Sequence, residues 1–337
     1  MVERHIRGLD SLRFVAALWV ALSHGGGLPF RPLTQGGGWF GHIIAAGNGV
    51  LFNGVAAVIV FFLISGFCIH IPWATAHRLN ILSHLTRRYI RIGGPLIGCY
   101  IIIYLSNAEV GAAVYAVLWS IYCEIIYYTI YPLIFYLSRQ LGIRTLVFVA
   151  TIISGSIIVS HWSYLYPWEF GIQLTWLVGL PSWLLGCLLA EQATHQKLAA
   201  TRRIWVWRGS ALIYTSAAVV AVFHSPITLG YPATMLIFSF YCYFWLQYEL
   251  TVYLNTKPSV VLEWGGTWSY SMYLIHNIVI VSFAQPHFPL PYLAGWALQL
   301  LAIFLASYAF YLAVEYPCHL LARRLGQAAS RAVPAAI

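Results

Sequence analysis

The segment Val50–Trp73 reads VLFNGVAAVIVFFLISGFCIHIPW and contains no aspartate, glutamate, lysine or arginine. A helix needs about 20 predominantly apolar residues to cross the roughly 30 Å hydrocarbon core of a bilayer. This segment meets that requirement and predicts a membrane-spanning helix. The whole chain has the same character, because 61% of its 337 residues are hydrophobic and only 8% are charged. Since a soluble domain carries about 25% charged residues, the composition excludes an ordinary soluble globule.

Ten apolar segments are long enough to be spanning helices, although some of them only just qualify. The third is short and glycine-rich, which favours a tilted or partly re-entrant helix, and the sixth contains Pro181, which favours a kink. The predicted segments cover residues 9–28, 50–73, 92–106, 112–137, 143–160, 172–190, 204–223, 232–252, 267–285 and 293–314.

The 18 lysines and arginines provide an independent test of this map. If the N-terminus is cytoplasmic and the ten segments alternate in direction, every basic residue except Arg31 falls on the cytoplasmic side. Cytoplasmic loops of membrane proteins carry such an excess of basic residues. The sequence therefore predicts an all-α, polytopic membrane helical bundle of about ten transmembrane helices with cytoplasmic N- and C-termini. The same distribution accounts for the net charge of +9 without a nucleic-acid partner.

We expect one transmembrane domain over residues 1–315 and a short basic cytoplasmic tail over residues 316–337. The first segment is interpreted as a retained helix rather than a cleaved signal peptide, because Asp10, Arg13 and His24 interrupt it. The six cysteines lie mostly within apolar stretches and lack the spacing of metal ligands. They predict neither a disulfide framework nor a metal site.

Ionisable side chains within a membrane are costly and usually functional. In the first segment, Arg13 and His24 are eleven residues apart, so on a helix they share a face and lie about 16 Å apart along the axis. Asp10 is close enough to Arg13 for a local ion pair. A lone buried histidine is usually structural, but one aligned with an arginine and an aspartate is a candidate for proton transfer.

Four further groups of polar residues are candidates. Ser65 and Gly66 permit close approach of a neighbouring helix or a ligand. The cluster Arg87, Arg88 and Arg91 is either an ordinary topology signal or a phosphate site, since guanidinium binds phosphate bidentately.

Glu124 lies in the middle of the fourth segment and is either a structural lock or a chemical group. Ser120 and Tyr128, four residues on either side, share its face and are expected to hydrogen-bond it. In the ninth segment, Ser269, Tyr273 and His276 share a face, and Glu315 is expected to anchor the end of the tenth. The outer aromatic stretch 161–169 is either an interfacial belt or a surface on which sugar rings stack.

Five of these motifs resemble, in order, those of the acyltransferase-3 family of membrane O-acyltransferases. They are Arg13 with His24 ten intervening residues later, the Ser-Gly-Phe motif in Phe62–Phe67, the RxxR motif Arg88–Arg91, the segment from Trp119-Ser120 through Glu124 to Tyr127, and the stretch Trp268–His276. The chain departs from the family at Ile125-Ile126, which replace an acid–glutamine pair, and at Cys68, which replaces a common leucine. Only 27 residues separate Arg91 from Trp119, which suggests that a helix or loop is missing there.

The resemblance implies a transferase, an O-acyltransferase for groups other than amino-acyl groups, in the cell inner (plasma) membrane. It implies transfer of an acyl group, expected to be acetyl, from cytoplasmic acyl-CoA to a hydroxyl of a carbohydrate or lipid-linked glycan, as in polysaccharide O-acetylation. No bound cofactor is expected, and acyl-CoA is a co-substrate. The expected catalytic residues are His24, Asp10, Arg13 and Glu124. The expected substrate-binding residues are Arg87, Arg88, Arg91, Ser65, Trp119, Ser120, Tyr128, Tyr273 and His276.

In this scheme His24 is the general base, Asp10 and Arg13 organise the access route or fix the first helix, and Glu124 orients the acceptor or a histidine. Because the arginines and His24 lie in opposite halves of the membrane, either the donor reaches inward or the acyl group is relayed through a covalent intermediate. The alternative function is a proton-coupled transporter or flippase in which Glu124, His24 and His276 form the proton pathway. A non-catalytic scaffold is the third possibility.

Overall fold

The structure is a computed structural model that describes residues 8–30, 38–76, 78–106, 108–195, 203–224, 229–284 and 291–332. All regular secondary structure in these ranges is helical, which confirms the all-α class. The basic residues Arg4, Arg7, Arg31, Lys197 and Arg202, which contribute to the charge argument, lie outside the described residues.

Each of the ten predicted segments corresponds to a helix. The helices are α1 (Leu9–His24), α4 (Gly54–His70), α5 (Ile81–Leu105), α6 (Ala108–Leu141), α7 (Ile143–Ser160), α8 (Gly171–His195), α9 (Ile204–His224), α10 (Tyr231–Asn255), α12 (Ser269–Ala284) and α13 (Tyr292–Phe310). The predicted third segment covers only the second half of α5, because the basic and polar first half of this helix lacks the apolar composition of a span.

Among the described residues, three further α-helices were not predicted: α3 (Trp39–Leu51), α11 (Val260–Thr267) and α14 (Tyr316–Ala332). The last of these comprises most of the predicted tail. A π-helical turn, Tyr311–Glu315, joins α13 to α14, and α14 packs along α5. The contact is close, because a Cβ added to Gly94 would lie 2.3 Å from the sulfur of Cys318. The tail is thus a packed helix over residues 316–332, while the domain limits themselves stay a prediction.

Within the described ranges, six stretches are long and apolar enough to cross a membrane: Trp39–His70, Val117–Leu141, Ile143–Ser160, Pro167–Thr194, Ile204–His224 and Tyr292–Arg331. The protein is therefore a multi-pass membrane protein. Helices α1 and α12 are shorter than 18 residues, and they lie inside the bundle rather than at its rim. The ten-span count and the cytoplasmic position of both termini stay predictions.

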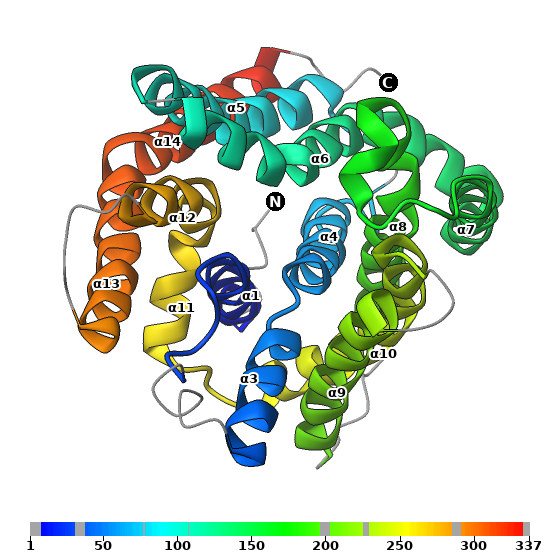
Figure 1. Ribbon diagram of the computed structural model, residues 1–337. Helices are drawn as coiled ribbons and strands as arrows, with labels where there is room; N and C mark the ends of the chain where they lie inside the picture. Colours follow the sequence, from blue (N-terminus) through cyan, green and yellow to red (C-terminus); the bar gives the residue numbers. More distant parts are fainter. Residues whose placement is uncertain are drawn as a thin grey trace.

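Helices α1 and α4 occupy the middle of the bundle, and the other helices surround them (Figure 1). Helix α1 packs against α4, α11 and α12, whereas α4 also packs against α8 and α10. Helix α6 contacts α4, α5, α8 and α12, so it closes the bundle on the side opposite α3 and α9. The two helices that carry the Arg13–His24 and Ser-Gly motifs are therefore the central ones.

The crossing of α4 and α8 depends on glycine. A Cβ added to Gly66 would lie 1.9 Å from the carbonyl oxygen of Trp183, and one added to Gly186 would lie 2.0 Å from that of Leu63. Small residues at such crossings allow helix backbones to approach closely in membranes. The predicted close approach at Ser65-Gly66 is therefore a helix–helix contact.

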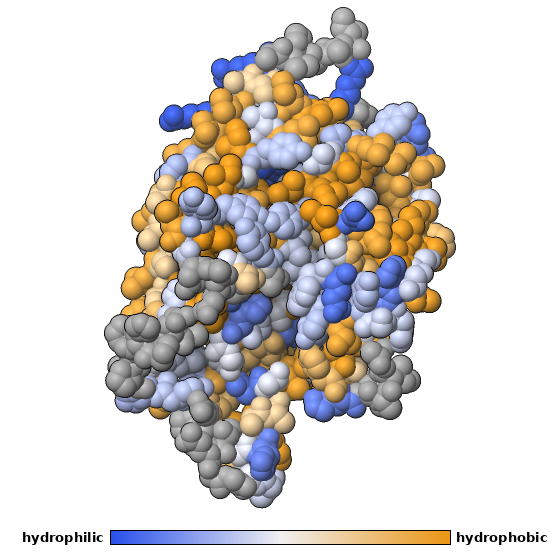
Figure 2. Space-filling model, turned by 45° about the horizontal axis from the view of Figure 1, so that its top comes forward, coloured by the Kyte–Doolittle hydropathy of each residue, from blue (hydrophilic) through white to orange (hydrophobic). Residues whose placement is uncertain are grey.

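The outer surface carries large aliphatic side chains, which a soluble protein would bury. Ile213 on α9 is 72% exposed, and Val159 on α7 is 68% exposed. On the face shown in Figure 2, broad hydrophobic areas flank a central region where hydrophilic residues gather. A lipid-facing exterior around a polar interior accounts for this distribution.

Candidate active site

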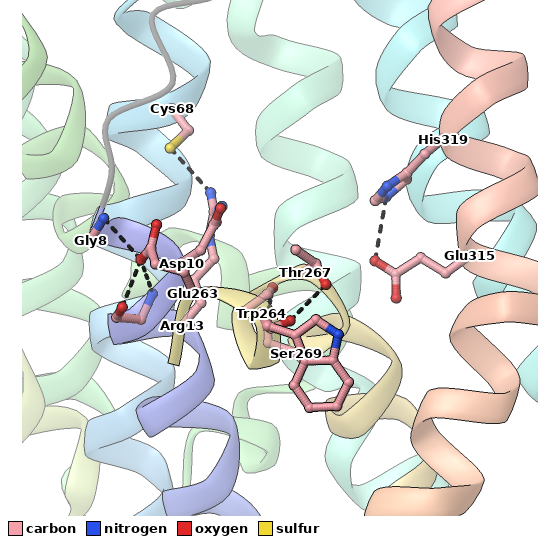
Figure 3. Close-up of polar contacts among 12 residues, drawn as sticks. Gly8, Asp10, Arg13, Cys68, Glu263, Trp264, Thr267, Ser269, Glu315 and His319 are labelled. Atoms are coloured by element: carbon pink, nitrogen blue, oxygen red, sulfur yellow. Dashed lines mark hydrogen bonds and ion pairs between the residues drawn. The ribbon is translucent and has the colours of Figure 1, made fainter. Parts of the chain in front are cut away.

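The N-terminal end of α1 holds the first group of predicted site residues. Arg13 Nη1 donates a hydrogen bond to Asp10 Oδ1 at 2.7 Å, which confirms the expected ion pair. Its other terminal nitrogen, Nη2, lies 3.1 Å from the sulfur of Cys68 on α4 (Figure 3). Arg13 thus joins the two central helices, and the guanidinium is directed toward α4.

Glu263 of α11 fixes this end of α1, and the sequence offered no signal for it. Its Oε1 accepts hydrogen bonds from the backbone nitrogens of Gly8 and Ser11, both at 2.9 Å, and from the Ser11 hydroxyl at 2.6 Å (Figure 3). A carboxylate at a helix N-terminus satisfies unpaired N–H groups and interacts favourably with the helix dipole. Helix α11 therefore holds the first turn of α1, where Asp10 and Arg13 lie.

A second cluster surrounds Glu124 in the middle of α6. The carboxylate lies beside the Ser65 and Tyr128 hydroxyls and within electrostatic range of Arg13 and Arg88. Ser65 Oγ and Tyr128 Oη are 2.8 Å apart. Residues from α1, α4, α5 and α6 thus meet around one carboxylate, whereas the spacing within α6 indicated only Ser120 and Tyr128 as its neighbours.

Ser120 has a different partner from the one predicted. Its hydroxyl lies 2.7 Å from Tyr273 Oη of α12, whereas we expected it to hydrogen-bond Glu124. Ser120 and Glu124 share a face of α6, but they are one turn apart and contact different neighbouring helices. Tyr273 also donates to the carbonyl oxygen of Val117 at 2.9 Å, so it fastens α12 to α6.

The predicted arginine cluster divides between two environments. Arg88 is partly buried, with its guanidinium 5.9 Å from the centre of the Tyr128 ring, whereas Arg91 is exposed. Arg87 packs against Gly326 of α14. Of the three, Arg88 lies within electrostatic range of Glu124 itself, whereas Arg91 lies within range of Tyr128 and Glu315.

His84 is a further residue of this region that the sequence did not suggest. It precedes the apolar half of α5, and its Nε2 lies 3.2 Å from the carbonyl oxygen of Tyr128. Burial, and then the positive charge of Arg88, lower the pKa of His84 to about 4. The ring is therefore neutral at physiological pH and leaves Arg88 as the charged group beside Tyr128.

At the other end of α1, the two predicted histidines meet. His24 Nδ1 lies 3.0 Å from His276 Nε2, and His276 Nδ1 lies 3.1 Å from the carbonyl oxygen of Met272. His276 is fully buried. We expected His24 to be buried too, but this last residue of α1 is exposed. A substitution of His276 therefore also alters the surroundings of His24, since the two rings share a hydrogen bond.

Glu315 has the anchoring contact that the sequence suggested, although to a neighbouring helix. Its side chain accepts hydrogen bonds from the backbone nitrogen and hydroxyl of Ser271 on α12. His319, one turn later, lies 3.4 Å from the same carboxylate (Figure 3). These two residues of the π turn and α14 stand opposite Asp10 and Arg13, so the tail helix borders the polar interior.

Trp119 lines a cavity of about 190 Å³ between α6 and the start of α8. Tyr122 from α6 and Trp168 from the 3₁₀ turn Pro167–Phe170 contribute to the same wall. Cavities that bind small molecules are lined predominantly by apolar and aromatic side chains. Part of the aromatic stretch 161–169 thus faces a cavity, in addition to any role at the membrane interface.

Among the residues that the structure describes, no three histidine, cysteine or acidic side chains are grouped so as to hold a metal ion. The site therefore consists of an arginine-containing polar cluster, a central carboxylate and a histidine pair. The protein is thus a helical membrane protein whose central helix α1 carries ionisable groups at both ends, Asp10 and Arg13 near its first turn and His24 at its last residue.

Comparison with known proteins identifies the family. The family model described as an acyltransferase domain, that of the acyltransferase-3 family, matches residues 6–315, and the chain belongs to this family. The chain is also similar to the acyltransferase MdmB of Streptomyces mycarofaciens, at 26% identity over 319 residues that cover 81% of this chain and 78% of that protein. No solved structure matches the chain. The protein is thus a membrane acyltransferase for groups other than amino-acyl groups, which decides against the transporter and scaffold alternatives.

Proposed function

We propose that the protein transfers an acyl group, most simply acetyl, from cytoplasmic acyl-CoA to a hydroxyl of a carbohydrate or lipid-linked glycan at the cell inner membrane. The observation that carries this proposal is the position of His24. It is an exposed imidazole at the end of the central helix, and it shares that helix with an arginine–aspartate pair about 16 Å away along the axis.

The donor occupies the cytoplasmic half in this proposal. Guanidinium groups bind phosphate bidentately, so Arg87, Arg88 and Arg91 are suited to the phosphates of the nucleotide. The long pantetheine arm extends from Arg88 past Glu124 toward His24. This route needs no covalent relay, because the arm itself covers the distance between the arginines and the histidine.

The acceptor approaches the exposed end of α1. A ring nitrogen of His24 accepts the proton of the acceptor hydroxyl as its oxygen attacks the thioester carbonyl. The carbon–sulfur bond then breaks, and the imidazolium returns the proton to the departing CoA thiolate. The aromatic cavity at Trp119 supports a ring-shaped acceptor such as a sugar, and Glu124 orients the reacting groups.

His24→Ala tests this proposal. Because a general base contributes about 10²- to 10⁴-fold to a rate, the variant is expected to lose acyl transfer by at least about 100-fold. Purified protein is incubated with labelled acetyl-CoA and membranes, and label in the carbohydrate fraction is measured. His224→Ala is the matched control, since His224 is likewise an exposed histidine at the last position of its helix, α9. Full transfer by His24→Ala would exclude His24 as the base.

A further inference from the structure

The hydrogen bonds of the histidine pair have a defined donor and acceptor at each end. These roles follow from the bond between His276 and the Met272 carbonyl oxygen. A carbonyl oxygen only accepts hydrogen bonds, so the bond between His276 Nδ1 and Met272 O requires a proton on Nδ1. A neutral imidazole has one ring N–H, and His276 Nε2 is then an acceptor. The 3.0 Å contact to this Nε2 requires that His24 Nδ1 carries the proton. In a neutral His24, Nε2 is therefore unprotonated.

The surroundings keep His276 neutral. Its side chain is fully buried, and within the described part of the chain its ring has hydrogen-bond and ring contacts with His24, Tyr273 and the Met272 carbonyl, none of which is negatively charged. A buried charge without a paired opposite charge is strongly disfavoured. Because Nδ1 of the neutral His276 ring donates to its own helix, Nε2 is the one ring nitrogen that can accept a hydrogen bond. This Nε2 accepts the hydrogen bond from His24.

The position of His276 is itself fixed. Tyr273, one turn earlier on α12, is bonded to Ser120 and to the Val117 carbonyl of α6, and its ring centre lies 6.0 Å from that of His276. The planes of the two histidine rings are inclined by only 21°, with centres 5.2 Å apart. This near-coplanar arrangement suits a hydrogen bond between ring edges, so the contact constrains the orientation of His24 as well as its tautomer.

From this geometry we infer that His276 is a positioning residue: it holds His24 in the tautomer and orientation that present an unprotonated Nε2 to the acceptor hydroxyl. The inference rests on the proposed role of His24 as the base. It assigns the proton-accepting atom, Nε2 of His24, and it makes the chain from Met272 O through His276 to His24 the support of that atom. His276 itself does not touch the substrate.

Two amide variants test the inference. In His276→Gln the side-chain amide extends to about the position of Nε2 and can still accept a hydrogen bond from His24 Nδ1. In His276→Asn the amide ends near the position of Nδ1 and cannot reach His24. Both changes remove the same imidazole from the same buried position, so general effects on packing are matched. The measurement is kcat and KM for acetyl-CoA and for the acceptor, per folded protein by size-exclusion chromatography.

We expect His276→Gln to keep kcat within about 10-fold of the parent and His276→Asn to lose about 100-fold, with both KM values unchanged, since only the base is misplaced. If His24→Ala is inactive but the two amide variants have equal kcat, the inference fails while the proposed function stands. If His24→Ala is fully active, both fail. If His276→Asn does not fold, the Gln variant decides: activity near that of the parent supports the inference, and activity as low as that of His24→Ala overturns it.

Discussion

Arg88 and Arg91 lie one turn apart on α5 but in different surroundings, and this contrast leads to a prediction at the scale of residues. The double variant Arg88→Lys, Arg91→Lys keeps the charge and therefore the topology signal, but it loses the bidentate geometry. A hydrogen bond to a charged group is worth about 1.5–3 kcal/mol, so we expect the KM for acyl-CoA to rise at least about 10-fold with abundance unchanged.

Steady-state kinetics with varied acyl-CoA would measure this change. Arg324→Lys is the control, because Arg324 is exposed on α14 and the proposal gives it no contact with the donor. An unchanged KM in the double variant would leave the two arginines with a topological role only.

Local spacing predicted some residue contacts and missed others. The Asp10–Arg13 pair follows from a separation of three residues within one helix, and it is present. Ser120 and Glu124 have the favourable separation of four, yet Ser120 is bonded to Tyr273, 153 residues later. Within one helix, spacing decides which side chains share a face, but it does not show which neighbouring helix that face meets.

At the scale of elements, the crossing of α4 and α8 gives a prediction about stability. Gly66→Ala places a Cβ 1.9 Å from a backbone carbonyl oxygen of α8, and neither backbone can move without separating the helices. Overpacking of this kind costs about 1–3 kcal/mol. We expect a lower midpoint of thermal unfolding in detergent and a lower yield of folded protein.

Gly155→Ala is the matched substitution on α7, where an added Cβ meets nothing within 4 Å. Because alanine has a higher helix propensity than glycine by about 1 kcal/mol, this variant is expected to be neutral or slightly stabilised. Equal loss of stability in both variants would show that the close crossing is not the cause.

The elements also show where composition is a poor guide. Helix α14 is amphipathic and basic, so its sequence resembles a solvated tail, but it packs along α5. Helix α11 is only eight residues long and carries no motif, yet it supplies Glu263 to the start of α1. Short or polar helices of this kind fall below the length and hydropathy that identify a span.

At the scale of the whole molecule, the prediction concerns orientation in the membrane. With the basic residues cytoplasmic, reporters fused after Gly230 or Pro291 are expected to lie outside, and reporters fused near Thr201 or at the C-terminus inside. Paired alkaline phosphatase and green fluorescent protein fusions would measure this, since the two reporters are active on opposite sides. A C-terminus accessible only from outside would contradict the ten-span map and the proposed depth of the donor site.

The sequence by itself determined the all-helical membrane class, the approximate positions of ten of the helices and the family. Hydropathy, charge distribution and motif order are properties of the chain that need no knowledge of neighbours. The tertiary structure alone decided that α1 and α4 are central, that Glu263 caps α1, and that His24 meets His276, 252 residues away. The physical reason is that lipid selects helices one by one through their apolar length, whereas the partners of polar side chains depend on which helices pack together.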